Sequence, residues 1–316
     1  MVVRFRQATS LLLITHARPD GDGLGSMAAL AISARQQGKR ARTLVPDKVP
    51  QRYAFLFGEE QPACGGDFAD IAASADLIII LDTCSFTQLD SIQPQIRAAK
   101  DRIVVIDHHV TSDDVGSLRW LDPTAAAAGV MTAELLDVLG WPLSQPAAEA
   151  LATAVTSDTG WLRFANTDPR CLRVMADLLE AGVRPDRLYA KLFQCDRPQR
   201  LALVGRMLAT MELHYGDRLA VMAIRKSDFA ATGAQPEETE NLVNEALRIG
   251  SVESAVLMVE HGDLLRVSLR SRDRVDVAAV ARIFGGGGHA RAAGVRVSES
   301  IETFKAKLVA AFAALA

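Results

Sequence analysis

The chain has 316 residues, a formal net charge of -3 at pH 7 and 49% hydrophobic residues, a length that suggests about two domains with buried cores. This charge excludes a strongly basic protein that attracts nucleic acid through its overall field, so a polyanionic ligand would need metal ions or a local basic patch. The longest apolar runs are too short for a signal-peptide core or a membrane span. The four cysteines are far apart, with no CxxC pair: Cys64, Cys84, Cys171 and Cys195. They predict a reduced, cytoplasmic chain without a cysteine metal cage.

Uninterrupted apolar runs alternate with helix-like segments through the first half of the chain. They predict strands at Ser10–Thr15, Ala41–Val45, Leu77–Leu81 and Arg102–Ile106. Continuous apolar runs are typical of parallel strands that are covered on both faces. We therefore predict an α/β fold whose N-terminal domain has a mainly parallel sheet flanked by helices.

The pattern becomes helical from about Ala125 to Leu213, and strands return after Asp217. The second set of strands is expected at residues 218–224, 254–260 and 264–270, before a helix and a glycine cluster. We predict an N-terminal domain over residues 1–185, a helical linker over 186–214, and a smaller C-terminal α/β domain with a mixed sheet over 215–316.

The stretch H-A-R-P-D-G-D-G-L-G-S places His16, Asp20 and Asp22 directly after the first predicted strand. The proline and glycines between them argue against a helix, so we predict a loop here, followed by a helix over Gly23–Gly38. Such a loop lies at the carboxyl edge of an open α/β sheet, where these folds place their sites.

Further carboxylates and imidazoles follow two later strands and one helix: Asp82, the triplet Asp107, His108 and His109, and Asp158 in T-S-D-T-G-W. One aspartate after a strand is more often a cap or turn residue. Several carboxylates and imidazoles gathered at one sheet edge would repel one another unless cations lay between them. The sequence has no local run of Lys or Arg that could neutralise these carboxylates. The sequence therefore predicts a site for Mn²⁺, Mg²⁺, Fe²⁺ or Zn²⁺. Its many ligands favour two bridged ions, the usual arrangement for in-line displacement at phosphorus.

Together these motifs resemble those of the DHH phosphoesterase superfamily. The matching elements are H-x-x-P-D-G-D-x-x-G-S, the isolated Asp82, D-H-H, S-D-T-G, and G-G-G-G-H-A-R-A-A-G at Gly285–Gly294, which is similar to the signature of the DHH-associated domain. They follow the family order across nearly the whole chain. One departure is Arg18, where many members have Asn; we expect this change to alter contacts to a phosphate, but it removes no ligand.

The resemblance implies a role for each residue of the cluster. The implied ligands are His16 and Asp20 for the first ion, Asp22, His108 and Asp158 for the second, and Asp82 as the bridge. Asp107 is expected to orient the ring of His108, and His109 to face the substrate phosphate as a hydrogen-bond donor or acid. The implied cofactors are two divalent ions, Mn²⁺ foremost, with Mg²⁺ or Co²⁺ as alternatives.

The four glycines at Gly285–Gly288 can be interpreted in two ways. Four consecutive glycines are usually a flexible turn, but glycine also lets backbone N–H groups approach a phosphate closely. The resemblance favours substrate binding, and Arg270 could grip phosphate oxygens in pairs. The predicted substrate contacts are Arg270, Gly286, Gly287, Gly288, His289 and Arg291.

Within the superfamily, this two-domain layout looks most like the nanoRNases. These enzymes hydrolyse short oligoribonucleotides, of about two to five residues, by metal-assisted chemistry, and also remove the 3'-phosphate of 3'-phosphoadenosine 5'-phosphate (pAp). The close alternative is a standalone phosphodiesterase for cyclic-di-AMP or linear pApA. The glycine-rich motif indicates a nucleotide ligand and so argues against an inorganic pyrophosphatase. A non-catalytic nucleotide sensor would be favoured if a metal ligand were missing, but every ligand of the motifs is present. We expect a monomer or homodimer that acts on short single-stranded RNA or a nucleotide and binds no membrane.

Overall fold

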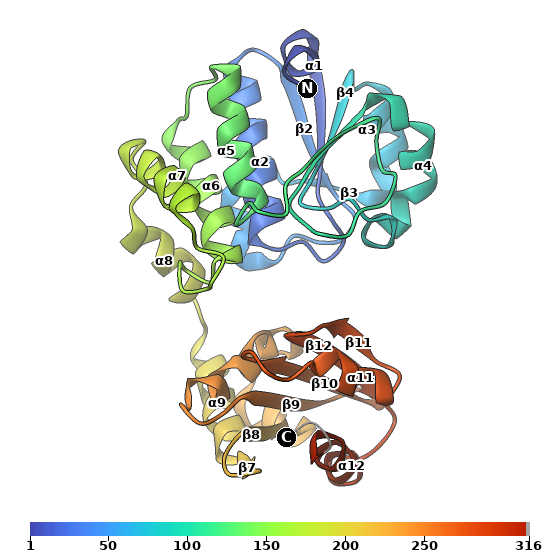
Figure 1. Ribbon diagram of the computed structural model, residues 1–316, viewed down its shortest axis with the longest axis vertical. Coiled ribbons are helices and arrows are strands. Elements are labelled where there is room, and N and C mark those ends of the chain that lie inside the picture. Colours follow the sequence, from blue (N-terminus) through green and yellow to red (C-terminus); the bar gives the residue numbers. More distant parts are fainter. Residues whose placement is uncertain (314–316) are drawn as a thin grey trace. The chain divides into compact units, whose positions relative to one another are not determined.

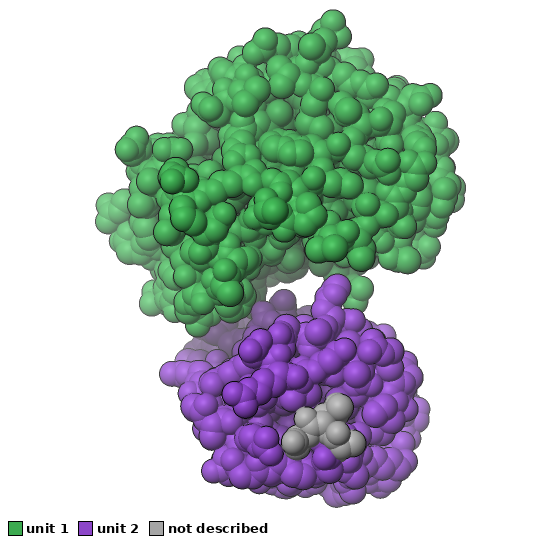
Figure 2. Space-filling view, viewed as in Figure 1, with its two compact units in different colours: residues 1–195 green, residues 196–316 purple. Residues whose placement is uncertain are grey.

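The computed structural model describes residues 1–313 and contains two compact units that meet in sequence between Cys195 and Asp196 (Figure 1, Figure 2). Helix α8 (Pro185–Phe193) contributes to the hydrophobic core of the first unit. Helix α9 (Pro198–Ala209) contributes to that of the second. The segment predicted as a linker over 186–214 is therefore largely helical, but its two helices belong to different cores.

The first unit is built on a six-stranded parallel sheet with the order β3-β2-β1-β4-β5-β6. Its strands are β1 (Ser10–Ile14), β2 (Arg40–Val45), β3 (Ala63–Cys64), β4 (Leu77–Leu81), β5 (Ile103–Asp107) and β6 (Leu118–Leu121). The central strands β1, β4 and β5 are buried along their whole length, which confirms the parallel sheet predicted from the apolar runs. The edge strand β6 was not predicted, because its short L-R-W-L sequence includes an exposed arginine.

Helices cover both faces of this sheet (Figure 1). One face packs on α1 (Val2–Gln7), α2 (Gly21–Gln36), α5 (Ala128–Leu139), α6 (Gln145–Asp158) and α7 (Pro169–Glu180). The other packs on α3 (Phe68–Ala73), α4 (Gln93–Ala98) and the 3₁₀ turn η3 (Phe86–Ile92). The remaining 3₁₀ turns are η1 (Gln51–Leu56), η2 (Gly65–Asp67) and η4 (Lys100–Arg102). Alternate residues of each central strand enter the two cores, as a sheet with two covered faces requires.

Helix α2 begins at Gly21, so Asp22 lies in its first helical turn and not in the predicted loop. Asp20 caps the helix, because its Oδ1 accepts a hydrogen bond of 3.0 Å from the N–H of Asp22. Close packing explains the glycines that argued against a helix. A Cβ on Gly21 would overlap the side chain of Ser157 in α6, and one on Gly23 would overlap that of Thr15. Glycine thus lowers the helix propensity here but allows α2 to approach α6.

The second unit has a mixed six-stranded sheet with the order β11-β12-β10-β9-β8-β7, which confirms the predicted mixed sheet. Its strands are β7 (Glu212–His214), β8 (Leu219–Ile224), β9 (Ser254–His261), β10 (Leu264–Ser271), β11 (Gly287–His289) and β12 (Ala292–Val297). Strands β8 and β9 are parallel, and the other pairs are antiparallel.

Two separate cores flank this second sheet. One face packs on α11 (Val277–Ile283) and α12 (Ile301–Ala313), and the other on α9 and the 3₁₀ turn η6 (Leu242–Arg248). Helix α10 (Lys226–Thr232) and the turn η5 (Pro236–Thr239) complete the unit. Across the described residues, none of the helices combines the length and apolar character needed to cross a membrane.

Candidate metal centre

The carboxyl edge of the first sheet gathers the six predicted metal ligands. His16 follows β1, Asp82 follows β4, and His108 follows β5. Asp20 caps α2, Asp22 lies in the first turn of α2, and Asp158 ends α6. Three groups have ligand atoms within 4.8 Å of one another: His16, Asp20 and Asp82; Asp22, His108 and Asp158; and Asp82, His108 and His109. The structure therefore brings together residues that are spread over more than 140 positions of the sequence, from His16 to Asp158.

Asp82 lies between the two main groups. Its Oδ2 is 3.4 Å from Nε2 of His16, and its Oδ1 is 3.4 Å from Nε2 of His108. The side chain is only 3% exposed, and the backbone has a φ of 62°, a left-handed conformation that is uncommon outside glycine. The two oxygens of one buried carboxylate thus face two different imidazoles, as a bridging ligand requires.

Backbone carbonyls fix the orientation of both imidazoles. Nδ1 of His16 is 2.9 Å from the oxygen of Ala17, and Nδ1 of His108 is 3.1 Å from the oxygen of Ala125. A ring that donates Nδ1–H to a carbonyl keeps its Nε2 lone pair available for a metal ion. Both Nε2 atoms point to the carboxylate cluster.

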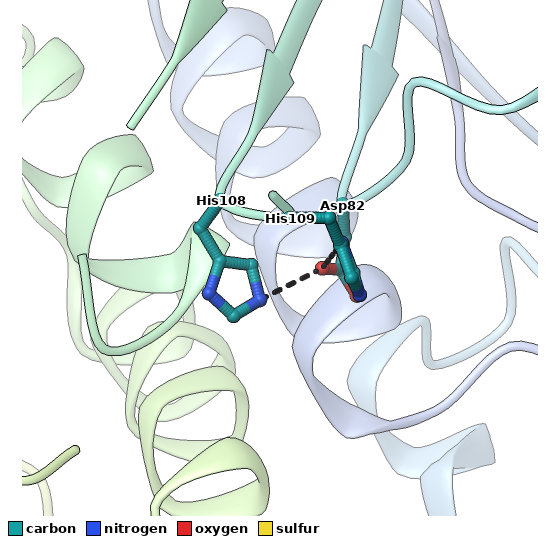
Figure 3. A group of neighbouring side chains, drawn as sticks. All are labelled: Asp82, His108 and His109. Carbon is teal, nitrogen blue, oxygen red and sulfur yellow. Dashed lines mark ion pairs between the residues drawn. The ribbon is translucent and has the colours of Figure 1, made fainter. Parts of the chain in front are cut away.

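Asp107 contacts His109 and not His108, contrary to the orientation predicted for it. Both histidines lie beside Asp82, whose Oδ1 is 3.4 Å from Nε2 of His108 and 3.8 Å from Nδ1 of His109 (Figure 3). Oδ1 of Asp107 is 2.7 Å from Nδ1 of His109 and also accepts the N–H of that residue at 3.2 Å. This hydrogen bond is the main cause of the raised pKa of His109. Asp107 ends β5, and side chains two residues apart in an extended chain lie on the same side of it, so residues 107 and 109 meet while residue 108 points elsewhere. The side chain of His109 is 43% exposed, so part of its ring faces solvent.

Asp22 is the most deeply buried carboxylate of the cluster, with no exposed surface. Its two oxygens accept hydrogen bonds from the N–H groups of Ala128 at 2.6 Å and Gly129 at 2.8 Å, at the beginning of α5. Burial, followed by the charges of Asp82 and Asp158, holds its pKa well above the usual range. A nearby cation would relieve this repulsion.

The donor set fits divalent ions. In the described part of the chain, Asp82 Oδ1 and His108 Nε2 are buried and have no hydrogen-bond partner, which is costly unless a ligand completes them. Burial lowers the pKa of His16 and His108, but their aspartate neighbours outweigh it and raise the pKa to about 11 and about 12. The cluster thus attracts positive charge, and carboxylate with imidazole suits Mn²⁺, Mg²⁺, Fe²⁺ or Zn²⁺.

The second unit aligns two of the predicted substrate residues across three strands. Arg270 in β10 pairs with Ala292 in β12, which pairs with His289 in β11. Directly paired residues share a sheet face, so Arg270 and His289 lie about 10 Å apart on either side of a small alanine. Burial lowers the pKa of Arg270, whose guanidinium donates to the carbonyl of Leu269 and makes no ion pair among the described residues.

Three of the other predicted substrate residues, Gly286, Gly288 and Arg291, also make close contacts within the second unit. A Cβ on Gly286 would lie 2.3 Å from the oxygen of Gly294, and one on Gly288 would lie 2.4 Å from that of Ala292. These glycines are therefore needed for the close pairing of β11 with β12. Gly287 has open space around it, and Arg291 forms a 2.8 Å ion pair with Asp273.

Comparison with known proteins identifies the class. Residues 10–157 match the DHH family, N-terminal domain, and residues 216–314 match the DHHA1 domain. The chain therefore belongs to the DHH family.

The relatives define its position further. The bifunctional oligoribonuclease and PAP phosphatase NrnA of Thermus thermophilus is 30% identical over 284 residues, which are 90% of this chain and 83% of that protein. An exopolyphosphatase-related protein from Bacteroides fragilis matches with a TM-score of 0.92 and 23% identity, over 98% of this chain and 94% of that chain. RecJ from Thermus thermophilus, in complex with Mn²⁺, matches with a TM-score of 0.60 and 14% identity, over 100% of this chain and 54% of RecJ. Both structures share the fold.

Proposed function

We propose that this protein is a metal-dependent phosphoesterase that hydrolyses short oligoribonucleotides to mononucleotides and removes the 3'-phosphate of pAp. The observation that carries this proposal is the position of Asp82, whose oxygens face His16 on one side and His108 on the other at 3.4 Å each. This geometry supports two ions held by one carboxylate. The NrnA relative, which spans most of both chains, supports the substrate class.

The proposed cofactors are two divalent ions. The first ion would be held by His16 and Asp20, and the second by Asp22, His108 and Asp158. Asp82 would bind both ions. When bound, such ions polarise phosphoryl oxygens and activate water for in-line attack. Manganese is our first choice, because the donor set has no thiolate and because RecJ, which shares the fold, is known in complex with Mn²⁺.

His109 is the proposed proton donor. Asp107 accepts the Nδ1–H of His109 at 2.7 Å and raises its pKa, which favours the imidazolium form, with Nε2–H directed away from Asp107. A histidine so placed can donate a hydrogen bond to a phosphate oxygen or a proton to the leaving oxygen. Asp107 therefore acts through His109, which it orients.

The second unit is proposed to bind the nucleotide. Arg270 and His289 share one sheet face across Ala292, and Arg270 offers a guanidinium that no carboxylate of the described residues neutralises. Guanidinium groups bind phosphate oxygens in pairs. The two proposed reactions have the same leaving group. Both the cleavage of a dinucleotide after its first nucleoside and the dephosphorylation of pAp release the 3'-oxygen of that nucleoside. One binding site for the 5' nucleotide would therefore serve both reactions.

The proposal is tested by giving the Mn²⁺-loaded protein pAp, linear pApA, cyclic-di-AMP, and RNAs of two to five residues, with products separated by chromatography. We expect mononucleotides from the short RNAs and from pApA, and AMP with phosphate from pAp. Hydrolysis of cyclic-di-AMP alone would replace the proposal by a cyclic dinucleotide phosphodiesterase. Nucleotide binding without turnover of any substrate would identify a sensor.

A further inference from the structure

One backbone segment, residues 125–129, holds two ligands of the second ion. The carbonyl of Ala125 accepts the hydrogen bond from Nδ1 of His108 at 3.1 Å. The N–H groups of Ala128 and Gly129 donate to the carboxylate of Asp22 at 2.6 and 2.8 Å. Because His108 follows β5 and Asp22 begins α2, this segment sets their relative position.

Asn166 connects the same segment to the third ligand. Its Nδ2 donates to the carbonyl of Ala126 at 3.0 Å and to the carbonyl of Asp158 at 3.1 Å. The amide nitrogen of asparagine has two donors, one for each of these bonds, whereas a carboxylate would repel both carbonyl oxygens. The side chain of Asn166 thus connects two parts of the chain. One is the segment 125–129, which orients His108 and Asp22, and the other is the end of α6, which carries Asp158.

The backbone between Asp158 and Asn166 has an unusual conformation. Gly160, Trp161 and Leu162 have φ values of 55°, 60° and 62°, three successive left-handed residues where single ones are usual. The turn lets residue 166 reach back to a carbonyl eight positions earlier. Non-glycine residues in this conformation persist where the surrounding structure fixes them, and they cluster at functional sites.

We propose that Asn166 is a positioning residue that sets the geometry of the second metal position by holding Asp158 in register with His108 and Asp22. The inference rests on the metal centre of the proposed function. A residue that merely caps α6 would bind the carbonyl of Asp158 alone. Asn166 instead connects the segment 125–129 with the end of α6. These two parts of the chain together position the group Asp22, His108 and Asp158.

The test compares Asn166→Asp and Asn166→Ala with Asp168→Ala as a matched control. Asp168 lies two residues away and caps α7 by accepting the N–H of Cys171 at 2.7 Å, so the control removes a local hydrogen bond that does not reach the metal ligands. Mn²⁺ is titrated into each metal-free protein by calorimetry. Electron paramagnetic resonance of the titrated samples distinguishes an isolated Mn²⁺ ion from a coupled pair. Thermal melting of each protein measures the loss of stability.

We expect both Asn166 variants to bind one Mn²⁺ ion as the wild type does and the second about ten- to a hundredfold more weakly, the range seen when residues that orient metal ligands are removed. Their spectra should show the isolated ion at Mn²⁺ concentrations that give the coupled pair in the wild type and in Asp168→Ala. If Asn166→Asp does not fold, Asn166→Ala supplies the same measurement without the added charge.

Two results would overturn the inference. One is binding of both ions with wild-type affinity by Asn166→Ala. The other is an equal loss of the second ion in Asp168→Ala at a similar melting temperature, which would make the effect one of general stability. Failure of the wild type to bind Mn²⁺ would instead overturn the metal centre itself, together with the inference built on it. Weak RNA hydrolysis by a wild type that binds two ions would count only against the substrate assignment.

Discussion

At the scale of single residues, the ligands of the candidate centre are prepared by hydrogen bonds from their other atoms. The Nδ1 atoms of His16 and His108 are engaged by carbonyls, and one oxygen of Asp20 caps α2. The atoms that face the centre are thereby held in place before any ion binds. Preorganised ligands of this kind bind metal ions without a large cost in side-chain entropy.

Replacing Asp82 by asparagine should affect both ions, because each oxygen of this carboxylate faces one imidazole. We expect Asp82→Asn to lose bound Mn²⁺ and to lower phosphodiester hydrolysis on the order of a hundred- to a thousandfold, as removal of a key electrostatic group does. Metal content measured by mass spectrometry should fall together with turnover. The exposed Asp90→Asn variant is the carboxylate control, and wild-type activity in Asp82→Asn would disprove the bridging role.

Metal binding should release protons. In the metal-free protein, neighbouring aspartates overcome the effect of burial and raise the pKa of His16 to about 11 and that of His108 to about 12. Both imidazoles are therefore protonated at neutral pH, and each must lose its proton before Nε2 can coordinate an ion. Because protons compete with the metal, the affinity for Mn²⁺ should rise as the pH increases.

Calorimetric titrations in two buffers of different ionisation enthalpy measure this release directly. We expect a net release of protons at pH 7.5 and stronger binding at pH 8.5 than at pH 6.5. An affinity that does not change with pH, together with identical heats in both buffers, would contradict protonated histidines in the metal-free centre.

At the scale of elements, the sequence predicted those features that have a short repeating pattern. The run L-I-I-I-L predicted β4 because each of its residues is buried, and the residues after such strands necessarily lie at one edge of a parallel sheet. Asn166 could not be recognised in the same way, since an asparagine in a loop is typical of a turn. Its partner Ala126 is 40 residues distant, and no local pattern indicates such a contact.

Two predictions about the site were wrong because they depend on tertiary contacts that no local sequence pattern indicates: the start of α2 and the partner of Asp107. The start of α2 was placed too late, because helix propensity counts the cost of a glycine but not the close packing that requires one, as Gly21 packs against Ser157 of α6. Asp107 was assigned to the wrong histidine, because adjacent histidines in D-H-H differ only in the direction that the backbone gives them after β5.

Asp76 ties β1 to the beginning of β4 and should stabilise the first unit in a pH-dependent manner. Its Oδ2 accepts the N–H groups of Thr9 at 2.9 Å and Ser10 at 3.0 Å, and the Thr9 hydroxyl at 2.7 Å. The side-chain hydrogen bond from Thr9, followed by the two backbone bonds, lowers the pKa of Asp76 from 3.8 to about 2. A lowered pKa means that the stabilisation is present above pH 3.8 and is lost as the pH falls through about 2.

We expect Asp76→Asn to lower the free energy of unfolding by about 1 kcal/mol at pH 7, a modest value because solvent screens this exposed carboxylate. Urea denaturation at pH 7, 5, 4 and 3 measures the difference from the wild type, which should shrink towards the most acid point. The Asp90→Asn variant again serves as the control. A difference that stays constant down to pH 3, or grows, would show that the charge of Asp76 does not contribute.

At the scale of the whole molecule, the two units carry different kinds of chemistry. The predicted metal ligands all lie between His16 and Asp158 in the first unit. The sheet of the second unit presents Arg270 and His289 on one face across Ala292, where a phosphate or a base could bind. Positioning of a substrate by groups remote from the reacting atoms can supply several kcal/mol of the reduction in the barrier.

This division predicts that recognition can be removed while the metal chemistry is kept. Arg270→Ala and His289→Ala should retain Mn²⁺ and the slow hydrolysis of bis(p-nitrophenyl) phosphate, a small activated diester that needs little positioning. Both should lower kcat/KM for pAp and dinucleotides by roughly ten- to a hundredfold, the cost of losing a charged contact to phosphate. Arg266→Ala is the matched control, because Arg266 lies on the same strand and face but donates to the hydroxyl of Thr239. If both kinds of substrate were lost equally with the metal content intact, or if Arg266→Ala had the same effect as Arg270→Ala, nucleotide recognition would not lie on this face of the second unit.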